Sequence, residues 1–408
     1  MNEQLIVKNF GPIKDATVDF KKVTVFIGPT GGGKSTLAKL AAILRDNNFY
    51  SSIKNKADEL NLFTDFSIRS YFQEESIIFW KHRDNDIVIT SKGVFISENL
   101  KEKADNIEQD LTEDQFKILF EKIAKIAINN NISLDQIQDT PFFKEEFDKF
   151  YSHQVLKPLY EQAMTPYTPH YIPSERIFIA AINTAWPGLL SENIGLPTHL
   201  LSFANQYFKA RESIEIIRIP FLEVDYFRSN GQDIIVSKEQ MPLKLSDAAS
   251  GIQSVAPMLV LLNYLSRQED KSQSFIIEEP ELNLYPTAQQ GLLNWLVEKC
   301  TQGENDLTIT THSPYILAHL NLLLYAHQVA DKHPDRADDV AKVVPRESWI
   351  NPKEFAAYHV EGQKENGVHS IVNPETGLVS YNGLDSTATA ETSDFEKLMD
   401  INAGLEVE

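Results

Sequence analysis

The N-terminal part of the chain alternates short apolar runs with polar turns and then changes to a helical period. The apolar runs at residues 5–8, 16–19 and 23–27 have the length of strands. After a glycine-rich turn, residues 35–45 repeat leucine and alanine at a spacing of three to four, which places them on one helical face. The pattern therefore predicts a strand, a glycine-rich loop and a helix in direct succession.

A long charged segment follows, from about residue 47 to residue 168. Its apolar residues have mostly helical spacing, although alternating runs at 86–90 and 94–97 predict one pair of strands. Two matches to the helix capping box support this interpretation, namely Thr112 with Gln115 and Ser133 with Gln136. We interpret the segment as a mainly helical insertion.

The second half of the chain returns to apolar strands and helices in alternation. A short strand at 170–172 is followed by a hairpin signal, Asn230-Gly231 between two alternating runs. The elements expected next are a helix at 250–265, a strand at 275–277, a helix at 287–300 and a strand at 307–311. This alternation predicts an α/β fold with a mostly parallel sheet. The last part, with short strands expected at 355–360, 369–372 and 378–381, is interpreted as a small strand unit with an acidic tail.

Composition supports a globular protein with a sizeable core. The chain has 408 residues, of which 42% are hydrophobic and 24% are charged. Its formal net charge of −20 argues against wrapping of nucleic acid by the whole surface. Cys300 is the single cysteine, so an intrachain disulfide and a cysteine-based zinc site are excluded. Because no apolar run has the length of a membrane helix and residues 1–4 lack the features of a signal peptide, we expect a cytoplasmic protein with no membrane partner.

The glycine-rich loop carries the first candidate chemistry. Residues 28–35 match the phosphate-loop pattern GxxxxGK[ST] between a strand and a helix, which is the context that the motif requires. Main-chain N–H groups at the helix N-terminus hold phosphates, Lys34 reaches the β- and γ-phosphates, and the Ser35 hydroxyl is expected to ligate Mg²⁺. A glycine-rich turn without a ligand is the weaker alternative. The candidate nucleotide-binding residues are Gly28, Pro29, Thr30, Gly31, Gly32, Gly33, Lys34, Ser35 and Thr36.

Three further motifs follow the phosphate loop. Glu278 and Glu279 end an apolar strand, where the first would hold Mg²⁺ and the second would polarise the attacking water. Alone, such a pair is more often a strand end that faces solvent. The sequence Ala-Ser-Gly-Ile-Gln at 249–253 opens an apolar helix and fits ordinary helix capping equally well. His312 follows the strand at 307–311, and a lone histidine is usually structural.

Taken together, the order of these motifs resembles that of the ATP-binding-cassette (ABC) ATPases. The segments 7–14, 277–286 and 310–317 are similar to the soluble branch that includes the SMC and RecF proteins and the overcoming-lysogenisation-defect (OLD) ATPases. The resemblance implies a P-loop NTPase of ABC type with a mostly parallel sheet core, an antiparallel β element and a largely helical insertion. It divides the chain into an ATPase head at 1–46 and 170–325, an insertion at 47–169, and a C-terminal strand unit with an acidic tail at 326–408.

The same resemblance implies ATP and Mg²⁺ as cofactors, held between two copies that close head to tail. Ser250 and Gly251, with Gln253 in the same signature motif, would contact the nucleotide of the partner copy. Glu279 would be the catalytic base, and His312 would sense the γ-phosphate.

Some positions depart from the pattern of these ATPases. Glu175 lies about where the family has its Q-loop glutamine, and Glu278 replaces the usual aspartate. The signature at 249–253 differs from Leu-Ser-Gly-Gly-Gln. We expect the last two differences to slow hydrolysis at most, without abolishing nucleotide binding.

Two comparisons within this branch bear on function. Many OLD-like proteins carry a Toprim nuclease, whose opening is superficially similar to residues 359–362, but no Asp-x-Asp follows, so we expect no nuclease in this chain. The size and the insertion resemble stand-alone ATPases of bacterial anti-phage systems such as Septu, PARIS and retron-associated modules. We therefore predict an oligomeric ATPase, at least a dimer, that acts as a nucleotide-driven switch for an effector protein such as a nuclease.

Two other functions remain as alternatives. A DNA-repair ATPase like RecF or SMC would bind DNA in a salt-sensitive manner, and the net charge of −20 counts against this partner. The cytosolic subunit of a membrane transporter is the least favoured, because the long insertion and the Glu-Glu-Pro-Glu stretch at 278–281 are not typical of transporter cassettes.

Overall fold

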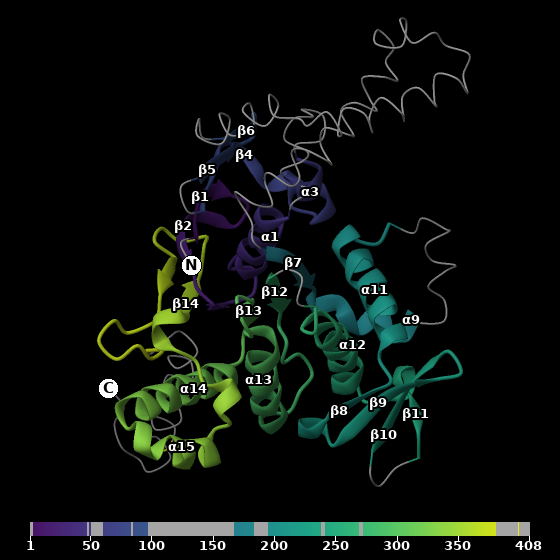
Figure 1. The fold of residues 1–408 in the computed structure, drawn as a ribbon. Helices are drawn as coiled ribbons and strands as arrows, with labels where there is room; N and C mark the ends of the chain where they lie inside the picture. The colour runs from purple at the N-terminus through teal and green to yellow at the C-terminus, as the bar shows by residue number, and fades with distance from the viewer. Residues whose placement is uncertain are drawn as a thin grey trace, which may run out of the picture.

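A six-stranded central sheet organises the molecule (Figure 1). The structure, a computed structural model, describes residues 3–46, 49, 60–82, 85–96, 167–182, 195–237, 241–268, 272–380 and 399. In spatial order the strands of the central sheet are β15 (Val368–Ser370), β14 (Phe355–Val360), β3 (Val23–Ile27), β13 (Asp306–Thr311), β12 (Ser272–Glu278) and β7 (Tyr167–Ile172). All neighbouring pairs are parallel except β14 and β15. The predicted α/β fold with a mostly parallel sheet is therefore confirmed.

Two antiparallel sheets flank this core. The five-stranded sheet has the order β2 (Ile13–Phe20), β1 (Glu3–Phe10), β4 (Phe72–His82), β5 (Asn85–Thr90) and β6 (Gly93–Ile96). The four-stranded sheet has the order β11 (Leu243–Lys244), β10 (Gln232–Ser237), β9 (Val224–Ser229) and β8 (Ile216–Ile219). Asn230 and Gly231 join β9 to β10 with φ angles of 51° and 76°, which favours a two-residue hairpin turn. The predicted hairpin is confirmed.

Helices cover both faces of the central sheet. The helix α1 (Lys34–Arg45) packs with the five-stranded sheet on one face, where Phe26 of β3 joins their core. Val25 and Ile27 point to the opposite face, as alternation along a strand requires. The helices packed on that face are α9 (Ile177–Ile182), α11 (Thr198–Ala210), α12 (Ser250–Leu265), α13 (Pro286–Cys300) and α14 (Pro314–Lys332). Two short helices, α3 (Asn61–Asp65) and α15 (Ala337–Val343), lie nearer the surface.

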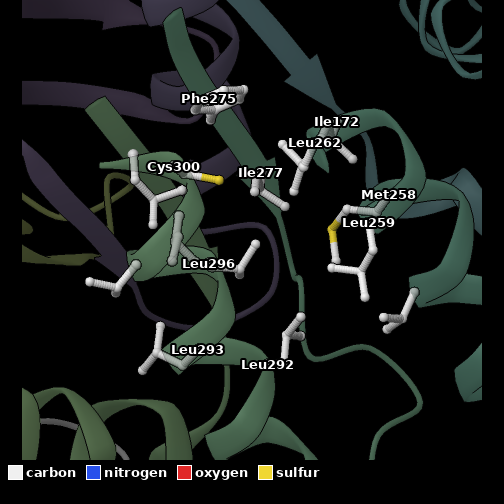
Figure 2. Close-up of a cluster of buried hydrophobic side chains, with 14 of the residues drawn as sticks. Ile172, Met258, Leu259, Leu262, Phe275, Ile277, Leu292, Leu293, Leu296 and Cys300 are labelled. Atoms are coloured by element: carbon white, nitrogen blue, oxygen red, sulfur yellow. The ribbon is translucent and has the colours of Figure 1, made fainter. Parts of the chain in front are cut away.

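The core of the larger face is formed where α12 and α13 meet β12. Figure 2 shows side chains of both helices converging on the strand, with Leu259 and Leu262 on one side of Ile277 and Leu296 on the other. All four are completely buried. Burial of each such side chain stabilises the fold by about 1.5–3 kcal/mol. This packing fixes the end of β12, where the two adjacent glutamates lie.

One strand within the proposed insertion was not predicted. The strand β4 pairs antiparallel with β1, although we interpreted most of this segment as helical. Its buried positions alternate, with Ile78 and Trp80 inside, but Ile77 on the other face is also apolar and hides the period of two. The predicted pair at 86–90 and 94–97 corresponds to β5 and β6. The capping boxes at Thr112 and Ser133 lie outside the described residues.

The C-terminal strand unit is part of the central sheet. The strand β14 pairs in parallel with β3, so the region expected as a separate unit contributes a strand to the central sheet. The helix α14 also runs across the predicted boundary at residue 325. The sequence pattern located the strand at 355–360 but carried no information on its partner. Within the described residues, no helix is both long and apolar enough to cross a membrane.

A buried ion network joins α1 to the central sheet and to the five-stranded sheet. Arg45 at the end of α1 is completely buried, and its Nε donates to Glu3 Oε2 at 3.1 Å. Its Nη1 donates to Asp306 Oδ1 at 2.8 Å and to Ser274 Oγ at 2.7 Å. Burial raises the pKa of Asp306 to about 6, and the charge of Arg45 opposes that rise. The network therefore ties α1, β1, β12 and β13 together.

Replacement of Arg45 by Met should lower the free energy of unfolding by about 3–5 kcal/mol, because it leaves buried carboxylates without their cation. Urea denaturation followed by circular dichroism measures this change. The matched control is Arg336→Met, which removes an exposed pair with Asp339 and should change stability little. Equal stability of the two variants would contradict a structural role for the Arg45 network.

Candidate nucleotide site

The P-loop joins β3 to α1 at the carboxyl end of the central sheet. Gly33 has a φ of 106°, a left-handed conformation that favours glycine, and it is the N-cap of α1. A Cβ on Gly32 would lie 2.3 Å from the Val360 carbonyl oxygen, so only glycine allows this close approach. Gly362 N–H also donates to Gly32 O at 2.8 Å. The segment 359–362, which is superficially similar to the start of a Toprim domain, therefore packs against the P-loop.

The side chain of Lys34 bonds to the main chain of the P-loop. Its Nζ donates to the carbonyl oxygens of Gly28 and Pro29, each at 2.9 Å, and the residue is 5% exposed. Burial lowers the pKa of Lys34, while Glu279 and then Glu278 raise it. The predicted carboxylates therefore lie close enough to Lys34 to stabilise its charge.

Glu278 is the last residue of β12 and is almost fully buried. Burial raises the pKa of its carboxyl, and the side chains of Ser35 and Tyr171 oppose this effect. Ser174 Oγ also lies 3.5 Å from Glu278 Oε2. Ser35 therefore lies close enough to influence Glu278, and Glu278 Oε1 is buried with no hydrogen-bond partner among the described residues.

Glu279 and His312 come together from two neighbouring strands. Glu279 Oε1 lies 3.0 Å from His312 Nε2, and both side chains are about one-third exposed. Glu279 has a φ of 42°, which is uncommon for a residue other than glycine. Its N–H donates to Thr310 O at 2.9 Å. The backbone of β13 therefore helps to aim the carboxylate towards the histidine.

The signature motif has no hydrogen bond to the P-loop in the described part of the chain. Ser250 is exposed at the start of α12, and no hydrogen bond joins it or Gly251 to residues 28–35 within the described chain. A Cβ on Gly251 would lie 2.7 Å from Asn283 O, so the helix start packs against the loop that follows the glutamates. Gln253 Nε2 donates to the carbonyl oxygens of residues 246 and 248 and orders the approach to the helix.

Glu175 is exposed in the turn after β7. Ser174 Oγ donates to Glu175 Oε2 at 3.2 Å, and the charge of Glu175 raises the pKa of Glu278. Glu175 therefore lies near the site, beside a predicted Mg²⁺ ligand.

A family comparison identifies the class of domain. The profile of a family described as "AAA ATPase domain" matches residues 1–168 and 96–317, which together span most of the chain. The chain belongs to this family. Its sheet, P-loop and flanking helices form a P-loop ATPase fold. No curated protein matches the sequence.

Solved structures similar to this AAA ATPase domain protein include two SMC heads. The first is the Smc head domain with an extended coiled coil bound to the C-terminal domain of ScpA, from Pyrococcus furiosus. It is 10% identical, covers 90% of this chain and 95% of its own, and has a TM-score of 0.36. The second is the SMC head domain from Thermotoga maritima, which is 11% identical, covers 78% of this chain and 92% of its own, and has a TM-score of 0.35.

Two residues of the candidate site were not predicted. Glu281 is buried, and its Oε1 accepts hydrogen bonds from Thr311 Oγ1 and, at 3.2 Å, from His312 N–H. Glu281 therefore holds the start of the segment that carries the histidine. Its place as the third glutamate of Glu-Glu-Pro-Glu was the only feature of the sequence that indicated a role. Arg176 is completely buried beside the glutamates. It directly follows Glu175 but has no motif of its own.

Proposed function

We propose that the protein binds ATP with Mg²⁺ and hydrolyses it. The contact of Glu279 with His312, beside Lys34, carries this proposal. A carboxylate and an imidazole next to a phosphate-binding lysine can orient water for in-line attack and stabilise charge on the γ-phosphate. Membership of the AAA ATPase domain family supports the same class of reaction.

The residues present fit a nucleoside triphosphate and Mg²⁺. Ser35 and Glu278 offer a hydroxyl and a carboxylate, and Glu278 Oε1 is buried with no hydrogen-bond partner among the described residues. Mg²⁺ commonly combines one or two such ligands with phosphate oxygens. A Cβ on Gly31 would meet nothing within 4 Å, so the loop has open space on that side. When bound, Mg²⁺ would neutralise charge on the β- and γ-phosphates.

Each protein group has a distinct part in the proposed reaction. Lys34 Nζ would exchange the carbonyls of Gly28 and Pro29 for phosphate oxygens. Glu279 would polarise the attacking water as the general base. His312 would donate from its ring to the γ-phosphate and hold the Glu279 carboxylate in place.

We further propose that two copies close head to tail around ATP. The exposed start of α12 supports this arrangement, because Ala249 and Ser250 are exposed where a second copy could bring its nucleotide. Each ATP would add contacts that exist only in the closed state, and hydrolysis would remove them.

Replacement of Ser250 by Arg should prevent closure and leave ATP binding by the single chain within about threefold of the unmodified value. The larger side chain would occupy space needed by the partner, whereas no hydrogen bond in the described chain links Ser250 to the P-loop. Light scattering with ATP, in the Glu279→Gln background, measures the mass. The control is Gln268→Arg, which adds the same charge beyond the other end of α12. Undiminished dimerisation of the Ser250 variant would rule out the role of the signature in trans.

The biological role proposed is a cytoplasmic switch that controls an effector protein, such as a nuclease, in anti-phage defence. The resemblance to stand-alone defence ATPases supports this role, and the net charge of −20 disfavours DNA as the main partner. The test is affinity purification of tagged Glu279→Gln from cells carrying the neighbouring genes, with Lys34→Ala as the control. A nucleotide-dependent protein partner would support the switch. Recovery of DNA without a protein would favour the RecF-like alternative.

A further inference from the structure

Arg176 connects three segments of the ATPase core through main-chain oxygens. Its Nη1 donates to Glu278 O at 2.6 Å and to Pro173 O at 3.1 Å. Its Nη2 donates to Glu279 O at 2.6 Å, and its Nε donates to Ser254 O at 3.1 Å. One guanidinium therefore joins the turn after β7, the end of β12 and the first turns of α12.

The Glu279 backbone needs such support. A residue other than glycine in a left-handed conformation costs of order 1–3 kcal/mol and persists only where its surroundings enforce it. At Glu279 the N–H is held by Thr310 and the carbonyl by Arg176. The peptide groups on both sides of the Cα are therefore fixed, which sets the direction of the side chain.

The chemistry of arginine suits this position. A guanidinium carries five donors in a planar fork, so it can bond to several carbonyl oxygens in different directions. Burial lowers the pKa of Arg176 to about 10, and Glu281, Glu279 and Glu278 oppose that fall. The group therefore stays charged at neutral pH, and its bonds to the carbonyls are charge-assisted.

We propose that Arg176 is a positioning residue for the hydrolysis step. It holds the Glu279 main chain so that the carboxylate meets the attacking water, and it ties this geometry to α12, the helix that carries Ser250. The inference rests on the proposed ATPase function. It adds that the direction of the catalytic carboxylate depends on a completely buried side chain, whose hydrogen-bond acceptors are main-chain oxygens. It also predicts that movement of α12 changes the rate of hydrolysis through this guanidinium.

The first test is Arg176→Lys. A lysine amine keeps the charge but cannot reach Ser254 O, Glu278 O and Glu279 O together. We expect kcat to fall by about tenfold or more, with the Kd for ATP changed by less than about threefold. Arg176→Gln, which buries no charge, serves as the second variant and should show the same split if the lysine variant does not fold. A wild-type kcat in a folded variant would overturn the proposal.

A double-mutant cycle distinguishes a positioning role of Arg176 from a purely structural role. If Arg176 acts through Glu279, its replacement should have almost no further effect on single-turnover hydrolysis in the Glu279→Gln background. An equal loss in both backgrounds, or a parallel loss of ATP binding, would overturn the proposal in favour of a structural role. The control is Arg45→Lys, a second fully buried arginine remote from the site, which should lower the melting temperature but leave kcat unchanged. If Glu279→Gln alone hydrolysed ATP at the wild-type rate, the proposed function of Glu279 itself would be wrong. That result is distinguishable from the outcomes that overturn the role of Arg176.

Discussion

Glu279→Gln should lower the rate of ATP hydrolysis by a factor of about 100 or more while ATP still binds. The amide keeps the volume of the carboxylate and an oxygen that can face His312, 3.0 Å away in the unmodified protein. It lacks the negative charge that polarises water. Single-turnover assays with labelled ATP measure hydrolysis, and equilibrium titration measures binding.

The matched control for this change is Glu298→Gln. Glu298 is a partly exposed residue of α13 that pairs with Lys299, so the same chemical change there should leave hydrolysis unaltered. Hydrolysis at the wild-type rate by Glu279→Gln would show that another group activates the water.

Lys34→Ala should weaken ATP binding by about 100-fold or more. Hydrogen bonds to charged groups contribute about 1.5–3 kcal/mol each, so loss of two of them to phosphate oxygens has this effect on Kd. The change also removes the positive charge that faces Glu278, Glu279 and Glu281, which leaves their charges to repel the phosphates. Titration with a fluorescent ATP analogue measures the Kd.

The control for Lys34 is Lys342→Ala. Lys342 is exposed on α15, where it pairs with Asp339, and its loss should not change the Kd. Retention of ATP affinity within about threefold by Lys34→Ala would contradict the assignment of the P-loop as the phosphate site.

The strands and helices that are covered on both of their faces were predicted well from the sequence. The expected ranges 23–27, 250–265 and 355–360 agree with β3, α12 and β14. In these segments local composition and tertiary environment favour the same conformation, because continuous apolar runs belong in a covered sheet or a buried helix. The P-loop was equally clear, since its glycines are needed for local conformation and close backbone approach.

The pairing of strands that lie far apart in the sequence was harder to predict. The strand β4 was missed because apolar residues on both faces hide its alternation, and the pairing of β14 with β3 joins segments more than 300 residues apart. Local patterns specify neither. The same limit applies to Arg176, whose acceptors are main-chain oxygens that every residue has. Only the folded geometry distinguishes it from other arginines.

Part of the candidate site was predicted from the sequence, and part was not. The sequence order indicated that Glu279 and His312 belong to one site, and the structure places them in contact. The buried role of Glu281 was not predicted, because an acidic triplet alone does not show which carboxylate turns inward. Its contacts with Thr311 and His312 depend on the register of β12 and β13.

The measurement that tests the central claim most directly is the mass in solution of Glu279→Gln with ATP and Mg²⁺, compared with ADP and with no nucleotide. Light scattering coupled to size exclusion gives this mass for the full chain. The account predicts at least twice the 46.3 kDa of one chain with ATP, and a smaller assembly with ADP or without nucleotide. A variant that binds ATP with unchanged affinity, yet has the same mass in all three conditions, would contradict a nucleotide-driven closure.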